Sequence, residues 1–339
     1  MRKSHYQFPN DYEYKFLGSS TAKNFFEADI LLKSQYQGSN LGSWSLVRQE
    51  GGYICEYAQI PCGKCIGCRM DYSRSWADRM TYHVLGKETY SYFLTLTYDD
   101  DSLDDLDHSE NYDLYALRFD DMTDFIKKLR NKFRDAQIDY YYSGEYGDQQ
   151  FRPHFHMIGY NFFIPDLEFW KLNDNGDPIY TSEILHGLWK KGIVAVSNYS
   201  WRGAAYTASY VEKKRDGRLQ VEYEAVGLTP EKSRMSRRPG IAHDYYVEHF
   251  EDIWKNNGLN VSRDVNKSGH LGIPRYFRKL AEKYGHDDLL LDFQKRSLER
   301  SNVLAPLELK NSSFDLNSIG DMLAFEEREI LSRKVNKKL

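Results

Sequence analysis

The sequence lacks any long run of apolar residues. No segment approaches the ~18 uncharged apolar residues that a membrane-spanning helix needs, and the first five residues lead into polar and aromatic sequence instead of a secretory stretch. We therefore expect a soluble protein that stays in the compartment where it is made and does not enter a membrane.

The chain also lacks a positive net charge. Its formal net charge is −4, which excludes a globally cationic nucleic-acid binder and leaves only local basic patches for that purpose. One such patch lies in residues 200–240, which hold nine Lys or Arg against five acids. A nucleotide-binding Gly-Lys loop is absent as well, so helicase activity would have to come from a host partner.

Cysteine is scarce and confined to one short segment. The four residues, Cys55, Cys62, Cys65 and Cys68, fall within 14 positions, which in a reducing cytoplasm favours metal ligation over disulfides. A closed tetrathiolate site would hold a structural Zn²⁺ in a loop-rich N-terminal segment. The tight spacing leaves two alternatives open, a three-Cys set without Cys55 and an iron–sulfur centre.

Hydrophobic periodicity predicts an α+β fold. From residue 92 to 197 the expected order is βαββαβ, with strands at 92–98, 138–146, 151–162 and 193–197 and helices at 122–133 and 181–191. This order matches a ferredoxin-like antiparallel sheet with its helices on one face. Helices are also expected at 71–86, 202–214, 241–257, 274–284 and 315–334. We therefore divide the chain into an N-terminal segment with the Cys cluster and a helix (1–90), a core (91–240) and a mainly helical region (241–339).

Two histidines one residue apart form a candidate metal site. Side chains alternate along a strand, so His154 and His156 point to the same face and can bind one cation. Glu145 precedes the hairpin turn, and antiparallel pairing would bring it opposite one of the two histidines. Such a mixed set suits Mn²⁺, tolerates Mg²⁺ or Zn²⁺, and leaves positions open for a phosphate. The alternative is that the two histidines only line a polar face of the sheet.

Two tyrosines one helical turn apart form candidate nucleophiles. Tyr206 and Tyr210 would present their phenols to a common point on a helix. A phenol with a pKa near 10 is ionised in about one molecule in a thousand at neutral pH, a deficit of roughly 4 kcal/mol. Lys213 or Lys214 would favour the phenolate or neutralise phosphate charge. Because the chain contains 27 Tyr, simple packing of the pair is the alternative.

Several motifs, taken together, resemble a known family. Residues 61–69 (PCGKCIGCR), 93–98 (FLTLTY), 152–156 (RPHFH), 206–214 (YTASYVEKK) and 235–240 (MSRRPG) are similar, in the same order, to motifs of the rolling-circle replication initiators of gokushovirus-type microviruses, within the HUH endonuclease superfamily. Agreement of separate motifs is more specific than any one of them. The resemblance covers about residues 55–280 and implies an HUH core for the predicted sheet.

The resemblance also implies a reaction. One tyrosine would attack a phosphodiester of the origin strand, become linked to the 5′ phosphate and release a 3′ hydroxyl that primes synthesis; the second would later help to close the displaced circle. The implied partners are single-stranded or supercoiled phage origin DNA and the helicase and polymerase of the bacterial host, in whose cytoplasm the protein would act.

Three arginines form a candidate DNA contact. Arg234, Arg237 and Arg238, with two tyrosines nearby, would make a basic and aromatic clamp on single-stranded DNA, and a solvated basic loop is the alternative. For the whole chain the rival class is a non-enzymatic, zinc-containing module that binds single-stranded nucleic acid, in which the His and Tyr residues only pack. A relaxase or transposase of the same superfamily is a third possibility, against which the Arg-rich and Cys-rich motifs argue.

Overall fold

The computed structural model describes much of the chain. It describes the backbone of residues 2–7, 15–21, 30–32, 45–50, 53–58, 66–87, 90–104, 106, 115–147, 151–213, 223, 225–264 and 267–311, and the side chains of most of these from Arg69 to Arg300. The expected helix at 315–334 lies outside these ranges. Among the described helices, none combines the length and the apolar character needed to cross a membrane.

The chain forms two compact units. One consists of residues 1–68 and 287–339, and the other of residues 69–286. The first unit contains a two-stranded sheet of β1 (Arg2–Gln7) and β2 (Lys15–Thr21), a three-stranded sheet of β3 (Ile30–Leu32), β4 (Ser45–Glu50) and β5 (Tyr53–Ala58), and the helix α9 (Asp287–Asn311). None of these five strands was expected from the sequence. The division at residues 90 and 240 stays a prediction.

The four cysteines fall at the end of the first unit and the start of α1 (Ile66–Leu85). Cys55 lies in β5 and Cys68 in α1, while Cys62 and Cys65 lie outside the described residues. The side chains of all four are outside the described part, so the zinc site stays a prediction.

The second unit is built on a seven-stranded antiparallel sheet. Its order is β12-β7-β8-β6-β11-β10-β9, and every neighbouring pair is antiparallel. The strands are β6 (Ser91–Thr97), β7 (Asp139–Tyr146), β8 (Pro153–Tyr160), β9 (Glu168–Leu172), β10 (Pro178–Thr181), β11 (Val194–Asn198) and β12 (Ser233–Met235). The predicted α+β class with a large antiparallel sheet is confirmed. The hairpin β9–β10 and the edge strand β12 are additions that the periodicity did not predict.

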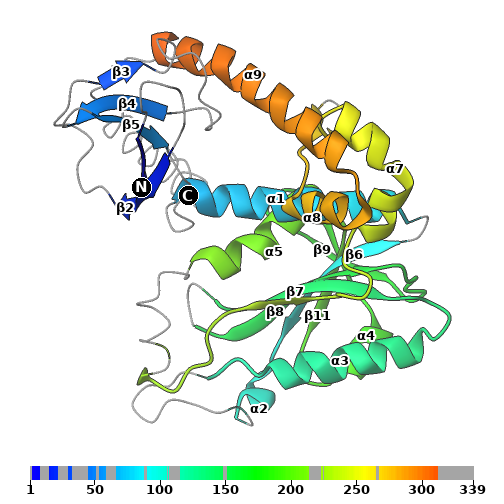
Figure 1. The fold of residues 1–339 in the computed structure, drawn as a ribbon. Helices are drawn as coiled ribbons and strands as arrows, with labels where there is room; N and C mark the ends of the chain where they lie inside the picture. Colours follow the sequence, from blue (N-terminus) through cyan, green and yellow to red (C-terminus); the bar gives the residue numbers. More distant parts are fainter. Residues whose placement is uncertain are drawn as a thin grey trace. The chain divides into compact units, whose positions relative to one another are not determined.

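One face of the sheet carries the main hydrophobic core. Leu94 and Leu96 of β6 and Phe155 and Met157 of β8 alternate onto this face, where α3 (Phe119–Lys132) and α4 (Glu183–Trp189) cover them (Figure 1). The apolar positions of α3 recur every three or four residues and are all buried: Met122, Phe125, Ile126 and Leu129. These two helices are the ones expected between the strands of the βαββαβ order.

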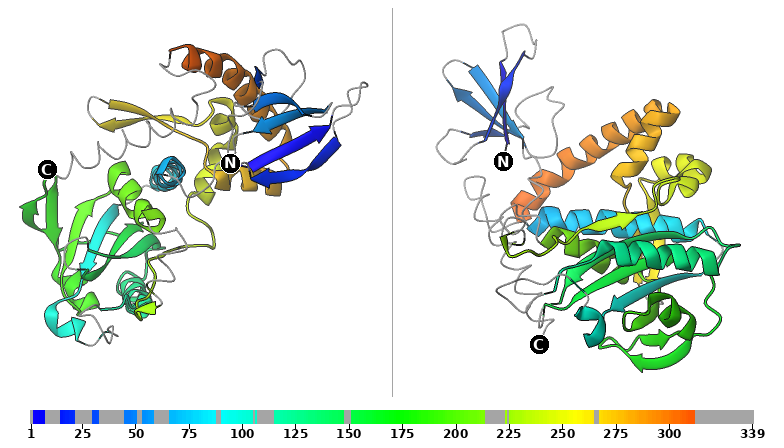
Figure 2. Two further views of the ribbon diagram at one scale, coloured as in Figure 1. Left: turned by 90° about the vertical axis from the view of Figure 1, so that its left-hand side faces the viewer. Right: turned by 90° about the horizontal axis from the view of Figure 1, so that it is seen from below.

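The other face of the sheet is covered by α1 and α5 (Trp201–Lys213), so helices lie on both faces and not on one (Figures 1 and 2). Trp76 of α1 packs against Tyr141 of β7, with ring centroids 5.0 Å apart. The hydroxyl of Ser73 in α1 donates to the carbonyl of Ala205 in α5 at 2.6 Å. The extra layer therefore ties α5 to α1 above the strands that carry the two histidines.

The short helix α2 (Asp100–Leu103) contributes Leu103 to the main hydrophobic core. The remaining elements of the second unit pack near α1: they are α7 (His243–Lys255), the hairpin β13 (Leu259–Asp264) and β14 (Lys267–Leu271), and α8 (Arg275–Tyr284). The rings of Tyr82 in α1 and Phe277 in α8 lie 5.1 Å apart. The expected helices at 241–257 and 274–284 thus correspond to α7 and α8.

Candidate metal and nucleophile site

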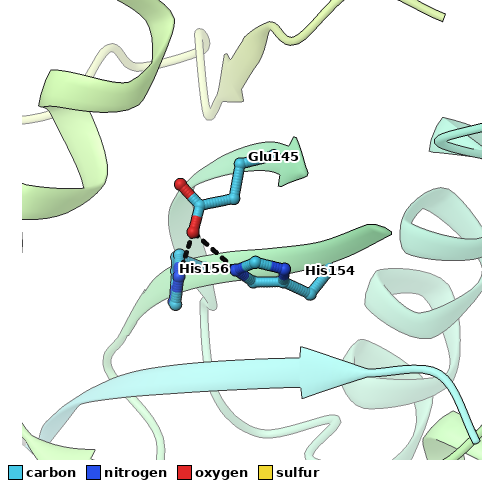
Figure 3. Close-up of side chains that lie close together, drawn as sticks. All are labelled: Glu145, His154 and His156. Carbon is cyan, nitrogen blue, oxygen red and sulfur yellow. Dashed lines mark hydrogen bonds and ion pairs between the residues drawn. The ribbon is translucent and has the colours of Figure 1, made fainter. Parts of the chain in front are cut away.

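Three side chains from two neighbouring strands converge on the α5 face of the sheet. Glu145 of β7 lies directly opposite His154 of β8 in the antiparallel register, and Ser143 lies opposite His156. Both histidines contact the same carboxylate oxygen of Glu145 (Figure 3). The Nε2 atoms of His154 and His156 are 2.5 Å and 2.9 Å from this Oε1. Glu145 and His156 are almost fully buried, and the side chain of His154 is 16% exposed. The three residues thus form a set of ligand atoms with one partly open side.

The second ring nitrogen of each histidine has its own partner. Nδ1 of His154 is 3.1 Å from the backbone carbonyl of Arg152, which can only accept a hydrogen bond, so Nδ1 carries a proton. Nδ1 of His156 is 3.1 Å from the hydroxyl of Thr95 on β6. A neutral His154 therefore has its lone pair on Nε2, pointing at a carboxylate oxygen that also offers only lone pairs. That contact requires a proton or a cation between the two atoms.

The electrostatics of the cluster favour a negative charge on Glu145 and a positive charge on His154. Burial alone would raise the pKa of Glu145, but the hydrogen bonds from the two histidines outweigh burial and hold its pKa below the usual value. Burial alone would lower the pKa of His154, but the hydrogen bond to Glu145 outweighs burial and raises it. Without another cation, the carboxylate thus favours the protonated form of His154.

The cluster fits a divalent cation. One ligand atom from each of Glu145, His154 and His156 lies within 4.8 Å of the others. The second carboxylate oxygen of Glu145, Oε2, is buried and has no hydrogen-bond partner in the described part of the chain. A buried carboxylate oxygen without a partner is costly, and a bound cation would satisfy it. Two imidazoles and a carboxylate are a donor set that Mn²⁺, Mg²⁺ and Zn²⁺ accept.

Tyr206 lies beside this cluster. Its ring centroid is 5.2 Å from that of His156, in an edge-on arrangement, and the side chain is 45% exposed. Ala204 and Ala208 on the same helix are fully buried, and their small size lets α5 approach the sheet closely. Tyr206 therefore presents its phenol to solvent next to the ligand atoms.

The other sequence-predicted residues of this helix are described less fully. Tyr210 and Lys213 lie within α5, but their side chains, and the whole of Lys214, fall outside the described residues. Helical spacing places Tyr210 one turn beyond Tyr206. A second nucleophile and the roles of the two lysines stay predictions.

The three arginines do not gather at the cluster. Arg234 of β12 pairs with Tyr142, and its guanidinium lies 5.3 Å from the ring centroid of Phe119 in α3, on the sheet face opposite Glu145. Arg237 and Arg238 are exposed in the turn that follows β12. The structure thus separates Arg234 from the other two.

Strand β6 contributes two residues to which the sequence analysis gave no role of their own, although both lie in the motif at 93–98. The ring of Phe93 stacks on that of His156, with centroids 5.3 Å apart, and Thr95 contacts Nδ1 of the same histidine. Both alternate with the core residues Leu94 and Leu96, but the pairing of β6 with β8, which brings them to His156, is not visible in the sequence. Glu231 is a further missed acid, since its Oε1 accepts the N–H of Tyr146 at 3.0 Å and its charge helps to raise the pKa of His154.

Comparisons with known proteins agree on one family. Residues 91–215 match a family model for replication-associated proteins of the ORF2 type. The chain is 32% identical to the replication-associated protein ORF2 of Spiroplasma virus 4, over 71% of this chain and 73% of that protein. It is 27% identical to the replication-associated protein VP4 of Bdellovibrio phage phiMH2K, over 76% of this chain and 78% of that protein. The replication-associated protein ORF4 of Chlamydia phage 1 is 29% identical, over 73% of this chain and 59% of that protein. No solved structure matches the chain.

Proposed function

Because the chain belongs to the family of microvirus replication-associated proteins, we propose that it starts rolling-circle replication by nicking one strand of the phage origin with Tyr206. In this proposal it is a metal-dependent endonuclease and strand transferase of the HUH type, acting on single-stranded or supercoiled origin DNA in the cytoplasm of the bacterial host. The observation that carries the proposal is the exposed phenol of Tyr206 beside the Glu145, His154 and His156 cluster.

In this proposal the residues of the site divide into metal ligands and groups that orient those ligands. Glu145 and the Nε2 atoms of His154 and His156 would hold Mn²⁺ or Mg²⁺, and the partly open side near His154 leaves room for a phosphate oxygen. A cation held there would stabilise the negative charge that develops on the phosphate oxygens during attack. The carbonyl of Arg152 and the hydroxyl of Thr95 fix how the two imidazoles point.

The nucleophilic step conserves the energy of the phosphodiester bond. The phenolic oxygen of Tyr206 attacks phosphorus, so an O–P bond forms while the bond from phosphorus to the 3′ oxygen breaks. The phenol proton passes to solvent, and the leaving 3′ oxygen takes up a proton. The product is a 5′-phosphotyrosine and a free 3′ hydroxyl, and attack by a 3′ hydroxyl in the reverse sense rejoins the strand without ATP.

The remaining residues of α5 complete the cycle in this proposal. Tyr210 is the second nucleophile, which attacks the regenerated origin after one round of synthesis. Lys213 and Lys214, one turn further, counter the charge of the phenolate or phosphate. Strand separation and synthesis are left to the helicase and polymerase of the host, because the sequence has no nucleotide-binding loop.

The test is formation of a covalent adduct with labelled single-stranded origin DNA in the presence of Mn²⁺ or Mg²⁺, resolved on denaturing gels. We expect an adduct with the wild-type chain, a weaker one with Tyr206→Phe or Tyr210→Phe, and none with the double variant. Tyr90→Phe, which removes the hydroxyl of another exposed tyrosine, serves as the matched control. An adduct that persists in the double variant, or DNA binding without any adduct, would favour a non-enzymatic binding module.

A further inference from the structure

A group of exposed cations lies at some distance from the candidate nicking site. It consists of two arginines in the turn after β12 and four cations on the outer face of α8, and we call it the basic surface: Arg237, Arg238, Arg275, Arg278, Lys279 and Lys283. We propose that this surface binds the phosphate backbone of the DNA that flanks the nick. The inference rests on the proposed function only for the position of the nick.

The turn and α8 are held together by Arg79, a half-buried arginine of α1. Nε of Arg79 donates to the carbonyl of Ile241 at 2.9 Å, and its guanidinium lies 3.7 Å from the ring centroid of Tyr276 in α8. Burial lowers the pKa of Arg79 to about 10. The hydroxyl of Tyr276 also reaches Gly240, since a Cβ at that glycine would lie 2.7 Å from it. The two parts of the basic surface are therefore neighbours.

The charge of α8 differs in sign from that of its neighbour α7. Its exposed face holds four cations and a single acid, Glu282, whereas the neighbouring helix α7 exposes Glu248, Glu251 and Asp252. The apolar side of α8 is used internally, because Phe277, Leu280 and Ala281 are buried. An interface with a protein partner would need an apolar centre. Among the exposed positions of α8, only Tyr284 is a large hydrophobic residue. A polyanion is the occupant that this charge pattern fits.

The basic surface lies on the same side of the sheet as the candidate site. Arg79 and Trp76 both belong to α1, and Trp76 packs on Tyr141, which shares a sheet face with Ser143 and Glu145. Helix α3 is also rich in cations, with Lys127, Lys128 and Lys132 exposed, but it covers the opposite face. DNA that reaches Tyr206 can continue over α8 more directly than over α3.

The distance between the candidate site and the basic surface corresponds to a number of DNA phosphates. The turn is attached to the sheet where the N–H of Ser236 donates to the carbonyl of Tyr140. Tyr140 and Glu145 are five residues apart on β7, about 17 Å along a strand. Since one duplex strand carries a phosphate about every 3.4 Å, the basic surface begins about five phosphates from the scissile one. Shorter DNA would occupy the candidate site without reaching α8.

The test compares DNA binding of full-length variants by fluorescence anisotropy over a range of salt concentrations. The probes are fluorescein-labelled oligonucleotides, single-stranded and duplex, that extend about three or about fifteen nucleotides from the nick position on either side. The variants are Arg275→Gln, Lys279→Gln and Lys283→Gln combined, and Arg237→Gln with Arg238→Gln. Lys127→Gln, Lys128→Gln and Lys132→Gln combined on α3 is the matched control for the three lost charges, and thermal melting verifies that each variant folds.

We expect the α8 variant to bind the long probe at least about tenfold more weakly and to lower the slope of log K against log salt by about three for duplex DNA. Binding of the short probe and adduct formation on it should stay unchanged, as should all measurements on the α3 control. If the single-stranded long probe loses more affinity than the duplex one, single-stranded DNA occupies the surface. A larger loss for the duplex probe means that duplex DNA occupies it. Equal losses in the α3 control, or an unchanged salt slope in the α8 variant, would overturn the proposal. Adduct formation is scored separately, so a failure of the nicking reaction cannot be mistaken for a failure of this surface.

Discussion

At the scale of single residues, Glu145 is the centre of the candidate site. One of its oxygens contacts both histidines and the other is buried without a hydrogen-bond partner in the described part of the chain. An amide in its place would keep the shape but lose the charge, and its NH₂ group would repel a cation. The carboxylate is therefore the member of the cluster least open to a conservative change.

We predict that Glu145→Gln weakens Mn²⁺ binding by more than about 100-fold, beyond what loss of an outer-shell partner costs. The measurement is free Mn²⁺ by electron paramagnetic resonance during titration of the apo protein. Glu168→Gln, in the exposed strand β9, is the control and should bind like wild type. Unchanged affinity in Glu145→Gln would remove this residue from the proposed ligand set.

Thr95 gives a second prediction at this scale. For His156 to bind a cation through Nε2, its Nδ1 must carry the proton, and the Nδ1–H then donates a hydrogen bond to the hydroxyl of Thr95. Thr95→Val keeps the shape and removes the acceptor, so we expect Mn²⁺ affinity to fall by about 10- to 100-fold. Thr95→Ser should restore most of it. If Val and Ser variants bind equally well, Thr95 does not position the histidine.

Asp139 makes stability depend on pH. His83 accepts the N–H of Ala242 at Nδ1, so its Nε2 carries a proton, and this Nε2 lies 3.3 Å from the carboxylate of Asp139. Burial alone would raise the pKa of Asp139, but the interaction with His83, together with Ser236 and the charge of Lys87, outweighs burial and lowers the pKa below the usual 3.8. A lowered pKa in the folded state means that the stabilisation is complete above the unfolded value and is lost as the pH falls through the folded value.

We therefore expect Asp139→Asn to destabilise the protein by about 1–3 kcal/mol at neutral pH. The difference between the melting temperatures of variant and wild type should shrink as the pH falls below 3.8. Thermal melts across the acid range test this, with Asp174→Asn, an exposed residue of the β9–β10 turn, as the control. A difference that stays constant with pH would mean that the charge of Asp139 is not the cause.

At the scale of elements, the site depends on how closely α5 lies on the sheet. The face of α5 that meets the strands carries Ala204, Thr207 and Ala208, all fully buried, and places Tyr206 at the edge of the contact. The hydrogen bond that the hydroxyl of Ser73 in α1 donates to the carbonyl of Ala205 also holds α5 in place. Small side chains thus set the distance between the phenol and the two histidines.

We predict that Ala208→Leu costs about 1–3 kcal/mol of stability through overpacking and moves Tyr206 away from His156. Adduct formation should then fall more than the loss of folded protein explains, at a temperature where the variant is still folded. Arg202→Leu, an exposed change on the same helix, should affect neither quantity. Normal adduct formation in folded Ala208→Leu would show that the spacing of α5 is not critical.

At the scale of the whole molecule, the chain combines two compact units, and the candidate site, its supporting strands and the basic surface all belong to residues 69–286. The first unit contains five strands in a region for which the sequence predicted only a Cys-rich segment. Zinc binding by Cys55, Cys62, Cys65 and Cys68 is the prediction that concerns this unit.

We expect the purified chain to contain about one zinc ion, measured by mass spectrometry of the metal content. Cys65→Ser should lose that ion, whereas Cys55→Ser distinguishes a four-Cys set, which also loses it, from a three-Cys set, which retains it. Wild-type protein free of zinc under reducing purification would contradict the tetrathiolate and three-Cys hypotheses alike.

The sequence by itself determined the features that depend on neighbours along the chain. The alternation of β6, the apolar stripe of α3 and the separation of His154 from His156 all follow from the periods of strands and helices, and so the α+β class was predictable. The position of Glu145 opposite a histidine could also be predicted from the sequence, because a short hairpin fixes the register of its two strands.

Only the tertiary structure decided which faces meet. The contact of Thr95 with His156 depends on the pairing of β6 with β8, which lie about sixty residues apart. The face of Arg234 depends on a three-residue strand, β12, too short to show a period. The second helix layer, which carries Tyr206, depends on packing between α1 and α5. Local periodicity determines which residues share a face of a strand or helix. Register and packing between distant segments determine which faces contact one another. The candidate site lies where the face of the sheet contacts α5, so its composition depends on the tertiary structure.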